Sequence, residues 1–111
     1  MATIKSYTDL DQSKKLARIL PLESADMYWW SSGKRYYIEA MDDGDFNEEE
    51  GHIRAWSLAA LLSVLPNASI LLKGFDKIYD LTNSGGEIAR ADNPIDACYE
   101  LILKLHELNL L

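Results

Sequence analysis

The last twenty residues, 92–111, constrain the fold most, because they specify one amphipathic helix from its first residue onward. Asn93 is a good N-cap, since its side-chain oxygen can accept a hydrogen bond from a free amide of the first turn. Pro94 follows at the first helical position, where its missing N–H is no loss. At about 100° per residue, the helix has one apolar face opposite a charged one. The apolar face consists of Ile95, Cys98, Leu101, Ile102, Leu105 and Leu108.

A second, narrower apolar stripe runs along the charged side of the same helix. It comprises Leu103 and Leu110, with Tyr99 and His106 beside them. Two interpretations are open. In the first, a neighbouring loop or strand covers the stripe, and any apolar side chain left at the surface is ordinary. In the second, the stripe is an interface for a partner protein or for a second copy of the chain.

A first helix is expected over residues 9–20. Asp9 and Gln12 have the spacing of a capping box, in which each side chain accepts a hydrogen bond from the main-chain amide of the other residue. Pro21 ends this helix, because the residue before a proline is disfavoured in the helical conformation.

Another helix is expected over residues 57–65. Ser57 is a suitable N-cap and Pro66 ends the segment. Because the residues between them are apolar nearly all round, and a helix without a polar face is normally buried, we expect this helix at the centre of the core.

Two aromatic segments, 27–30 and 35–38, predict a β-hairpin with a two-residue turn at Ser32 and Gly33. On one face this turn pairs Trp29 with Tyr36 and Met27 with Ile38. On the other it pairs Trp30 with Arg35 and Tyr28 with Tyr37. The second set, Tyr28, Trp30, Arg35 and Tyr37, is a candidate aromatic surface of the kind that stacks single-stranded bases.

The net charge of −7 is mostly local. Residues 42–50 hold six acids and no base, whereas the remaining sequence has twelve acids against eleven Lys and Arg. We expect residues 42–52 to form an acidic, mobile loop, because like charges repel and three consecutive glutamates have little to bury. The near-neutral remainder offers no basic groove, so nucleic acid is an unfavourable partner.

The acidic segment has a partial resemblance to a calcium loop. Asp43, Asp45 and Asn47 have the spacing of the first three EF-hand ligands. The sixth position is Glu48 where the sharp turn needs glycine, and the twelfth is Arg54 where a bidentate glutamate is required. The sequence therefore predicts a solvated acidic loop with no calcium site of the EF-hand type, and weak cation binding by the loop stays open.

Three short strands are expected over residues 70–73, 77–81 and 87–90, separated by turn-forming residues. Strands joined by short turns form an antiparallel meander. The order helix, hairpin, helix, meander, helix predicts a single α+β domain over residues 1–111, with three helices packed on one face of a mostly antiparallel sheet of about five short strands.

No catalytic constellation is visible. Cys98 and His106 lie about 12 Å apart along one helix, too far for a thiolate–imidazolium pair. A dyad of Cys98 with His52 requires the fold to bring them together, and Cys98 is better explained as a buried small hydrophobe. The common glycine-rich phosphate-binding motifs and the nucleophile-elbow motif are absent, so no cofactor and no enzymatic activity are predicted.

Four segments of the chain resemble a family of small uncharacterised proteins from gut anaerobic bacteria and their phages or mobile elements. These segments are residues 8–16, 56–66, 92–99 and 103–107. They cover the three expected helices, and their shared residues are helix caps and core positions. The resemblance implies a similar fold and a mobile-element setting, and it implies no mechanism.

The sequence favours a cytoplasmic protein, because it has a single cysteine, no signal-like start and no long apolar segment. The function predicted is binding of another macromolecule, with a protein as the first choice and a second copy of the chain as one candidate. Two alternatives stay open. One is an acidic decoy that imitates nucleic-acid phosphates, and the other is a hydrolase with a polar pocket near His52.

Overall fold

The computed structural model describes residues 5–42, 44–66, 70–73, 78–82 and 86–111. In chain order the elements are α1 (Leu10–Leu16), the 3₁₀ turn η1 (Leu22–Ser24), β1 (Met27–Ser31), β2 (Tyr36–Ala40), the 3₁₀ turn η2 (Glu48–Glu50), β3 (Ile53–Ala55), α2 (Leu58–Val64), β4 (Ile70–Lys73), β5 (Tyr79–Thr82), β6 (Ile88–Ala91) and α3 (Pro94–Glu107).

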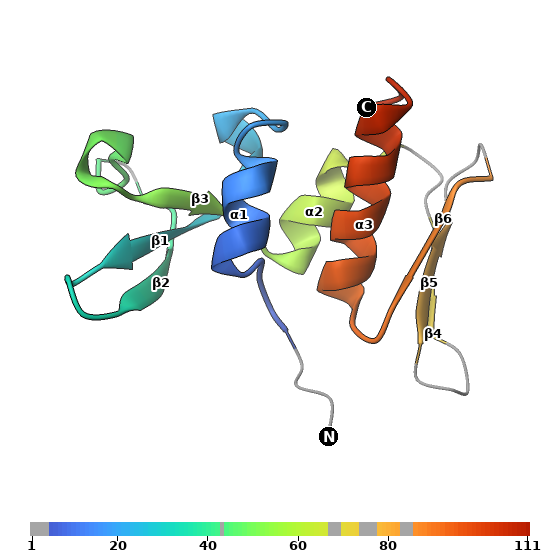
Figure 1. The fold of residues 1–111 in the computed structure, drawn as a ribbon, viewed down its shortest axis with the longest axis horizontal. Coiled ribbons are helices and arrows are strands. Elements are labelled where there is room, and N and C mark those ends of the chain that lie inside the picture. Colours follow the sequence, from blue (N-terminus) through green and yellow to red (C-terminus); the bar gives the residue numbers. More distant parts are fainter. Residues whose placement is uncertain (1–4, 43, 67–69, 74–77, 83–85) are drawn as a thin grey trace.

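The three helices lie between two antiparallel sheets (Figure 1). One sheet has the strand order β2-β1-β3 and the other has the order β4-β5-β6. The expected class, α+β with three helices and antiparallel strands, is confirmed. The strands were expected in one sheet, and they divide between two. Within the described ranges, no helix combines the length and the apolar character that crossing a bilayer requires.

The β1–β2 hairpin has a different register from the predicted one. Trp29 pairs with Ile38 and Trp30 with Tyr37, two positions away from the predicted pairs. The two-residue turn was wrong because the loop contains four residues, 32–35, closed by a hydrogen bond of 3.0 Å from the amide of Ser32 to the carbonyl of Arg35. A shift of two residues preserves the face of every side chain, because side chains alternate with a period of two.

The predicted start of α1 is confirmed and its predicted end is wrong. Asp9 and Gln12 form the complete capping box. The helix ends at Leu16 rather than at residue 20, and residues 17–20 continue as a turn. The guanidinium of Arg54 in β3 donates to the carbonyl of Leu20 at 3.2 Å, which satisfies a main-chain acceptor beyond the helix end.

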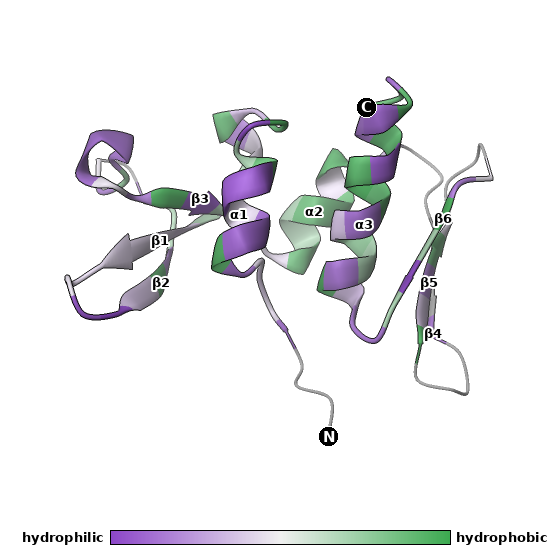
Figure 2. Ribbon diagram, viewed as in Figure 1, coloured by the Kyte–Doolittle hydropathy of each residue, from purple (hydrophilic) through white to green (hydrophobic). Residues whose placement is uncertain are grey.

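Helix α2 begins at the predicted Ser57 cap, but it is not the centre of the core. Leu61 is its fully buried residue, whereas Leu62 is 38% exposed. Figure 2 shows α2 in green between α1 and α3. Helix α2 packs on α3 and η1. Ala59, Leu62 and Ser63, which share one side of the helix, are exposed.

Helix α3 buries most of its predicted apolar face in the core. Asn93 caps it by accepting from the amide of Asp96 at 2.9 Å. Its buried side chains are Ile95, Ala97, Cys98, Leu101, Ile102 and Leu105. Leu108 was expected on this face and is 48% exposed, because the helix ends at Glu107 and the chain turns away at Asn109 with a φ of 58°.

Trp56, directly after β3, is fully buried. Its indole Nε1 donates to Ser24 Oγ at 2.9 Å, and its amide and carbonyl bond to Thr8, which is also fully buried. Trp56 therefore holds together three parts of the chain: the segment before α1, the turn η1 and the start of α2.

Candidate functional site

A polar network joins the N-terminal ends of α1 and α3. Asp96 lies at its centre and accepts from Lys5 Nζ at 2.7 Å, from Gln12 Nε2 at 2.7 Å and from Asn93 Nδ2 at 2.8 Å. Burial alone would raise the pKa of Asp96, but these three donors hold the pKa below its ordinary value. The network fixes the start of α3 against α1.

We expect Asp96→Asn to lower the free energy of unfolding at neutral pH by about 1 kcal/mol, since the group is partly exposed and its charge is screened. A carboxyl whose folded pKa is depressed stabilises the fold above its unfolded pKa, and this contribution is lost as the pH falls through the folded value. The wild type should therefore lose more stability than Asp96→Asn below pH 3.8. Urea unfolding at several pH values measures this difference.

The matched control is Glu100→Gln, which removes an exposed carboxylate from the same helix. An acid dependence of Asp96→Asn as steep as that of the wild type would contradict the role given to the network.

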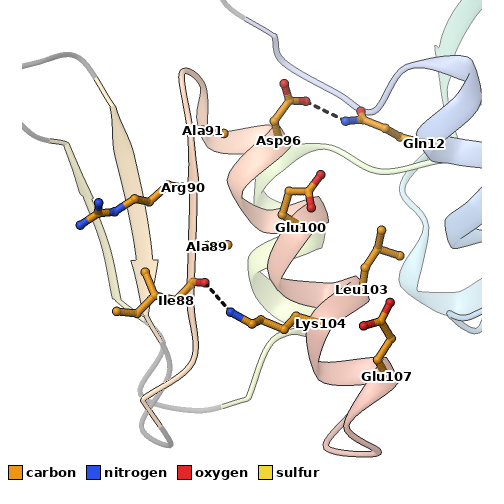
Figure 3. A pocket seen from close by; sticks show the side chains of 10 residues that line it. All are labelled: Gln12, Ile88, Ala89, Arg90, Ala91, Asp96, Glu100, Leu103, Lys104 and Glu107. Carbon is orange, nitrogen blue, oxygen red and sulfur yellow. Dashed lines mark hydrogen bonds between the residues drawn. The ribbon is translucent and has the colours of Figure 1, made fainter.

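A groove with a volume of about 640 Å³ lies beside this network (Figure 3). The outer side of α3 contributes Asp96, Glu100, Leu103, Lys104 and Glu107 to it. The whole of β6 lines the groove along one side, and Gln12 of α1 lies at one end. The groove is thus bounded by a strand, a helix and a polar cluster that holds the two helices in place.

The strand β6 has a free edge. Among the strands that the structure describes, it pairs with β5 alone, as the last strand of its sheet. The carbonyl of Ile88 accepts from Lys104 Nζ of α3 at 3.1 Å, so this main-chain group points towards the groove. Main-chain groups two residues apart in a strand face the same edge. We therefore place the amide and carbonyl of Arg90 at the same edge.

The charges along the groove are unequally paired. Lys104 lies 3.9 Å from Glu87, and Arg90 forms an ion pair of 2.9 Å with Asp80. Asp96 is paired with Lys5. Glu100 and Glu107, however, have no ion-pair partner among the described residues. The groove therefore presents two uncompensated negative charges.

The four residues of the predicted α3 stripe differ in exposure and in their surroundings. Leu103 is half-buried and lines the groove. Tyr99 is half-buried and packs against the core. His106 lines a separate cavity with Leu20, and Leu110 is exposed beyond the end of α3. The stripe is therefore partly covered by the fold, and Leu103 is its member in the groove.

One residue of the predicted aromatic surface, Tyr28, is buried. Tyr28 is only 3% exposed, because Phe46 and His52 pack on its ring with centroid distances of 5.7 and 5.1 Å. Trp30 stacks on Tyr37 at 4.8 Å. The guanidinium carbon of Arg35 lies 5.9 Å from the centroid of the Tyr37 ring. Trp30, Arg35 and Tyr37 thus remain together on the hairpin.

The described part of the acidic segment folds against the first sheet, which consists of β2, β1 and β3. Asn47 caps η2 by accepting from the amide of Glu49, and Glu48 pairs with Arg54 at 2.6 Å. Asp43 lies outside the described residues, and the expected mobility of residues 42–52 stays a prediction. Among the described residues there is no group of three or more His, Cys, Asp or Glu side chains that could hold a metal ion.

Cys98 and His52 lie in different parts of the fold. Cys98 is fully buried in α3, and burial raises the pKa of its thiol to about 12. His52 stacks on Tyr28 at the first sheet, and its Nδ1 accepts from the amide of Asn47 at 3.0 Å. His52 lines none of the three principal cavities formed by the described residues.

No protein-family model, curated protein or solved structure matches this chain. The resemblance to the small proteins of gut bacteria and their phages stays a prediction. The candidate functional surfaces of the chain are the groove beside β6 and the hairpin of β1 and β2.

Proposed function

We propose that the chain is a protein-binding module, and that the groove takes an extended segment of a partner protein as a new strand beside β6. The free edge of β6, facing a groove lined by α3, is the observation that carries this proposal. Strand addition of this kind gains affinity from main-chain hydrogen bonds and specificity from side-chain contacts.

The dimensions of the groove suit a short segment. β6 has four residues, and an extended chain advances about 3.3 Å per residue, so the paired length is about 13 Å. A strand at this edge would lie over the outer side of α3, where Leu103 offers an apolar contact beside charged neighbours.

The charges favour a basic segment. Glu100 and Glu107 lie on the same side of α3, seven residues or about 10.5 Å apart. Lysine or arginine side chains of a bound strand, pointing towards α3, would meet these carboxylates. An acidic segment would meet repulsion there, which gives the site a basis for selecting its partner.

A direct test uses isotope-labelled protein and three eight-residue peptides: one alternating valine with lysine, one alternating valine with glutamate, and the lysine peptide interrupted by prolines. We expect the lysine peptide to shift the amide resonances of residues 88–91 and of the outer side of α3. The proline peptide should bind more weakly, because it lacks the amides that pair with β6.

Two variants separate the main-chain and charge contributions. Arg90→Pro removes a main-chain amide from the free edge of β6. Its matched control is Arg90→Ala, which removes the same side chain and keeps the amide.

The double variant Glu100→Lys, Glu107→Lys reverses the charge of the groove. Its control is Glu49→Lys, which reverses a charge on η2, outside the groove. Arg90→Pro and the double variant should each raise the dissociation constant at least about tenfold over their controls, or about 1.4 kcal/mol. Equal binding of all three peptides, or no shift at residues 88–91, would refute the proposal.

A further inference from the structure

We infer that two copies of the chain associate through β2, pairing antiparallel about Ile38, so that two β2-β1-β3 sheets become one continuous sheet. This inference concerns the opposite end of the molecule from the groove and does not depend on the proposed strand addition there.

Strand β2 is an unprotected edge. Within the described part of the chain it pairs with β1 alone, and four of its five residues are exposed, including Tyr36 at 41% and Tyr37 at 40%. Natural edge strands are usually shielded by proline, by charged side chains such as lysine, by a bulge or by a covering element. β2 contains no proline or lysine and has Glu39 as its single charged residue, and its pairing with β1 is continuous over all five residues.

The other edge of the same sheet is covered. β3 lies against α1, so a partner strand has no access there. The hairpin of β1 and β2, in contrast, extends away from the helices, as Figure 1 shows at its left side. The position of β2 therefore leaves room for a second copy of the molecule.

The register about Ile38 is self-complementary in its apolar residues. Trp29 lies between Ile38 and Ile53 in the three-stranded sheet, and all three side chains are half-buried. Antiparallel pairing about Ile38 places the two Ile38 residues opposite one another. The six side chains then form one row across the joined sheet, on one face, where cross-strand contacts contribute to stability.

The other face brings charged side chains together. In this register Tyr37 of one copy lies opposite Glu39 of the second. The diagonal neighbours of that Glu39 are Arg35 and Glu39 of the first copy, so an Arg35–Glu39 attraction accompanies a Glu39–Glu39 repulsion across the two-fold axis. One Glu39 oxygen already accepts from the hydroxyl of Tyr28 at 3.1 Å, which leaves its other oxygen for the arginine. The two-fold axis repeats each contact, giving two Arg35–Glu39 pairs.

Light scattering coupled to size exclusion, over a wide range of protein concentrations, tests the inference. We expect a concentration-dependent dimer of twice the chain mass of 12.6 kDa. Ile38→Lys should raise the dimer dissociation constant at least about tenfold, because it places two cations opposite one another in the apolar row. Ile88→Lys, which changes an exposed strand residue of the other sheet, is the matched control and should dimerise like the wild type.

A charge exchange keeps the test valid if Ile38→Lys fails to fold. Arg35→Glu and Glu39→Arg should each weaken the dimer, and the double variant should restore it. Ile38→Cys should form an intermolecular disulfide, since Cys98, the single thiol of the wild type, is buried. A monomer at all concentrations, no recovery in the double variant, or no disulfide would each overturn the inference.

Discussion

Replacing Trp56 with alanine is expected to lower the free energy of unfolding by about 3–5 kcal/mol. Trp56 is fully buried, and its removal leaves a large cavity where the segment before α1, η1 and α2 meet. It also leaves the hydroxyl of Ser24 without its indole donor. Small domains have a total stability of about 5–15 kcal/mol, so this loss takes a large part of it.

Urea unfolding followed by far-ultraviolet circular dichroism measures the effect without depending on tryptophan fluorescence. Trp30→Ala is the matched control, because Trp30 lies on the hairpin and is only half-buried. Trp56→Phe should cost less than Trp56→Ala, since it keeps most of the ring volume. A cost for Trp56→Ala no larger than that for Trp30→Ala would contradict the central position of Trp56.

The thiol of Cys98 is expected to react with a disulfide reagent at least about 1,000-fold more slowly in the native protein than in urea. Cys98 is fully buried, and the raised pKa of about 12 keeps the thiol neutral. Because the thiolate is the nucleophile, reaction requires that the core open around α3. Each 1.4 kcal/mol of opening free energy slows the reaction tenfold.

The control places a cysteine at an exposed position on the same segment. Leu110→Cys in a Cys98→Ala background should react at close to the rate of an unfolded peptide, since Leu110 is 55% exposed. Rapid labelling of native Cys98, unaffected by added urea, would show that the thiol is accessible and would reopen the possibility of a nucleophilic role.

The features that short-range interactions determine, above all the starts of the helices, were predicted correctly from the sequence. Asn93 and Pro94 specify the start of α3, and Asp9 with Gln12 specifies the start of α1, because each cap is made within a few residues. The hairpin shows the limit of such signals. The sequence from residue 31 to residue 34 suits turns of several lengths, and the choice between them sets the register of every pair.

The features that make the candidate site depend on contacts between distant segments. β3 is only three residues long, and it becomes a strand by pairing with β1. The division of the strands into two sheets leaves β6 at an edge beside α3, which no local pattern of Ile88 or Arg90 indicates. The covering of Tyr28 by Phe46 and His52 likewise follows from the path of the acidic segment, not from its composition.

The separation of the strands into two sheets also bears on how the chain folds. Every strand pair of the first sheet lies within residues 27–55, and every pair of the second lies within residues 70–91. Loop closure is less costly in entropy when the joined segments are close in sequence, and domains with local contacts fold faster. During synthesis the first sheet and α1 can therefore assemble before the ribosome has made α3, leaving the docking of α3 as the late step.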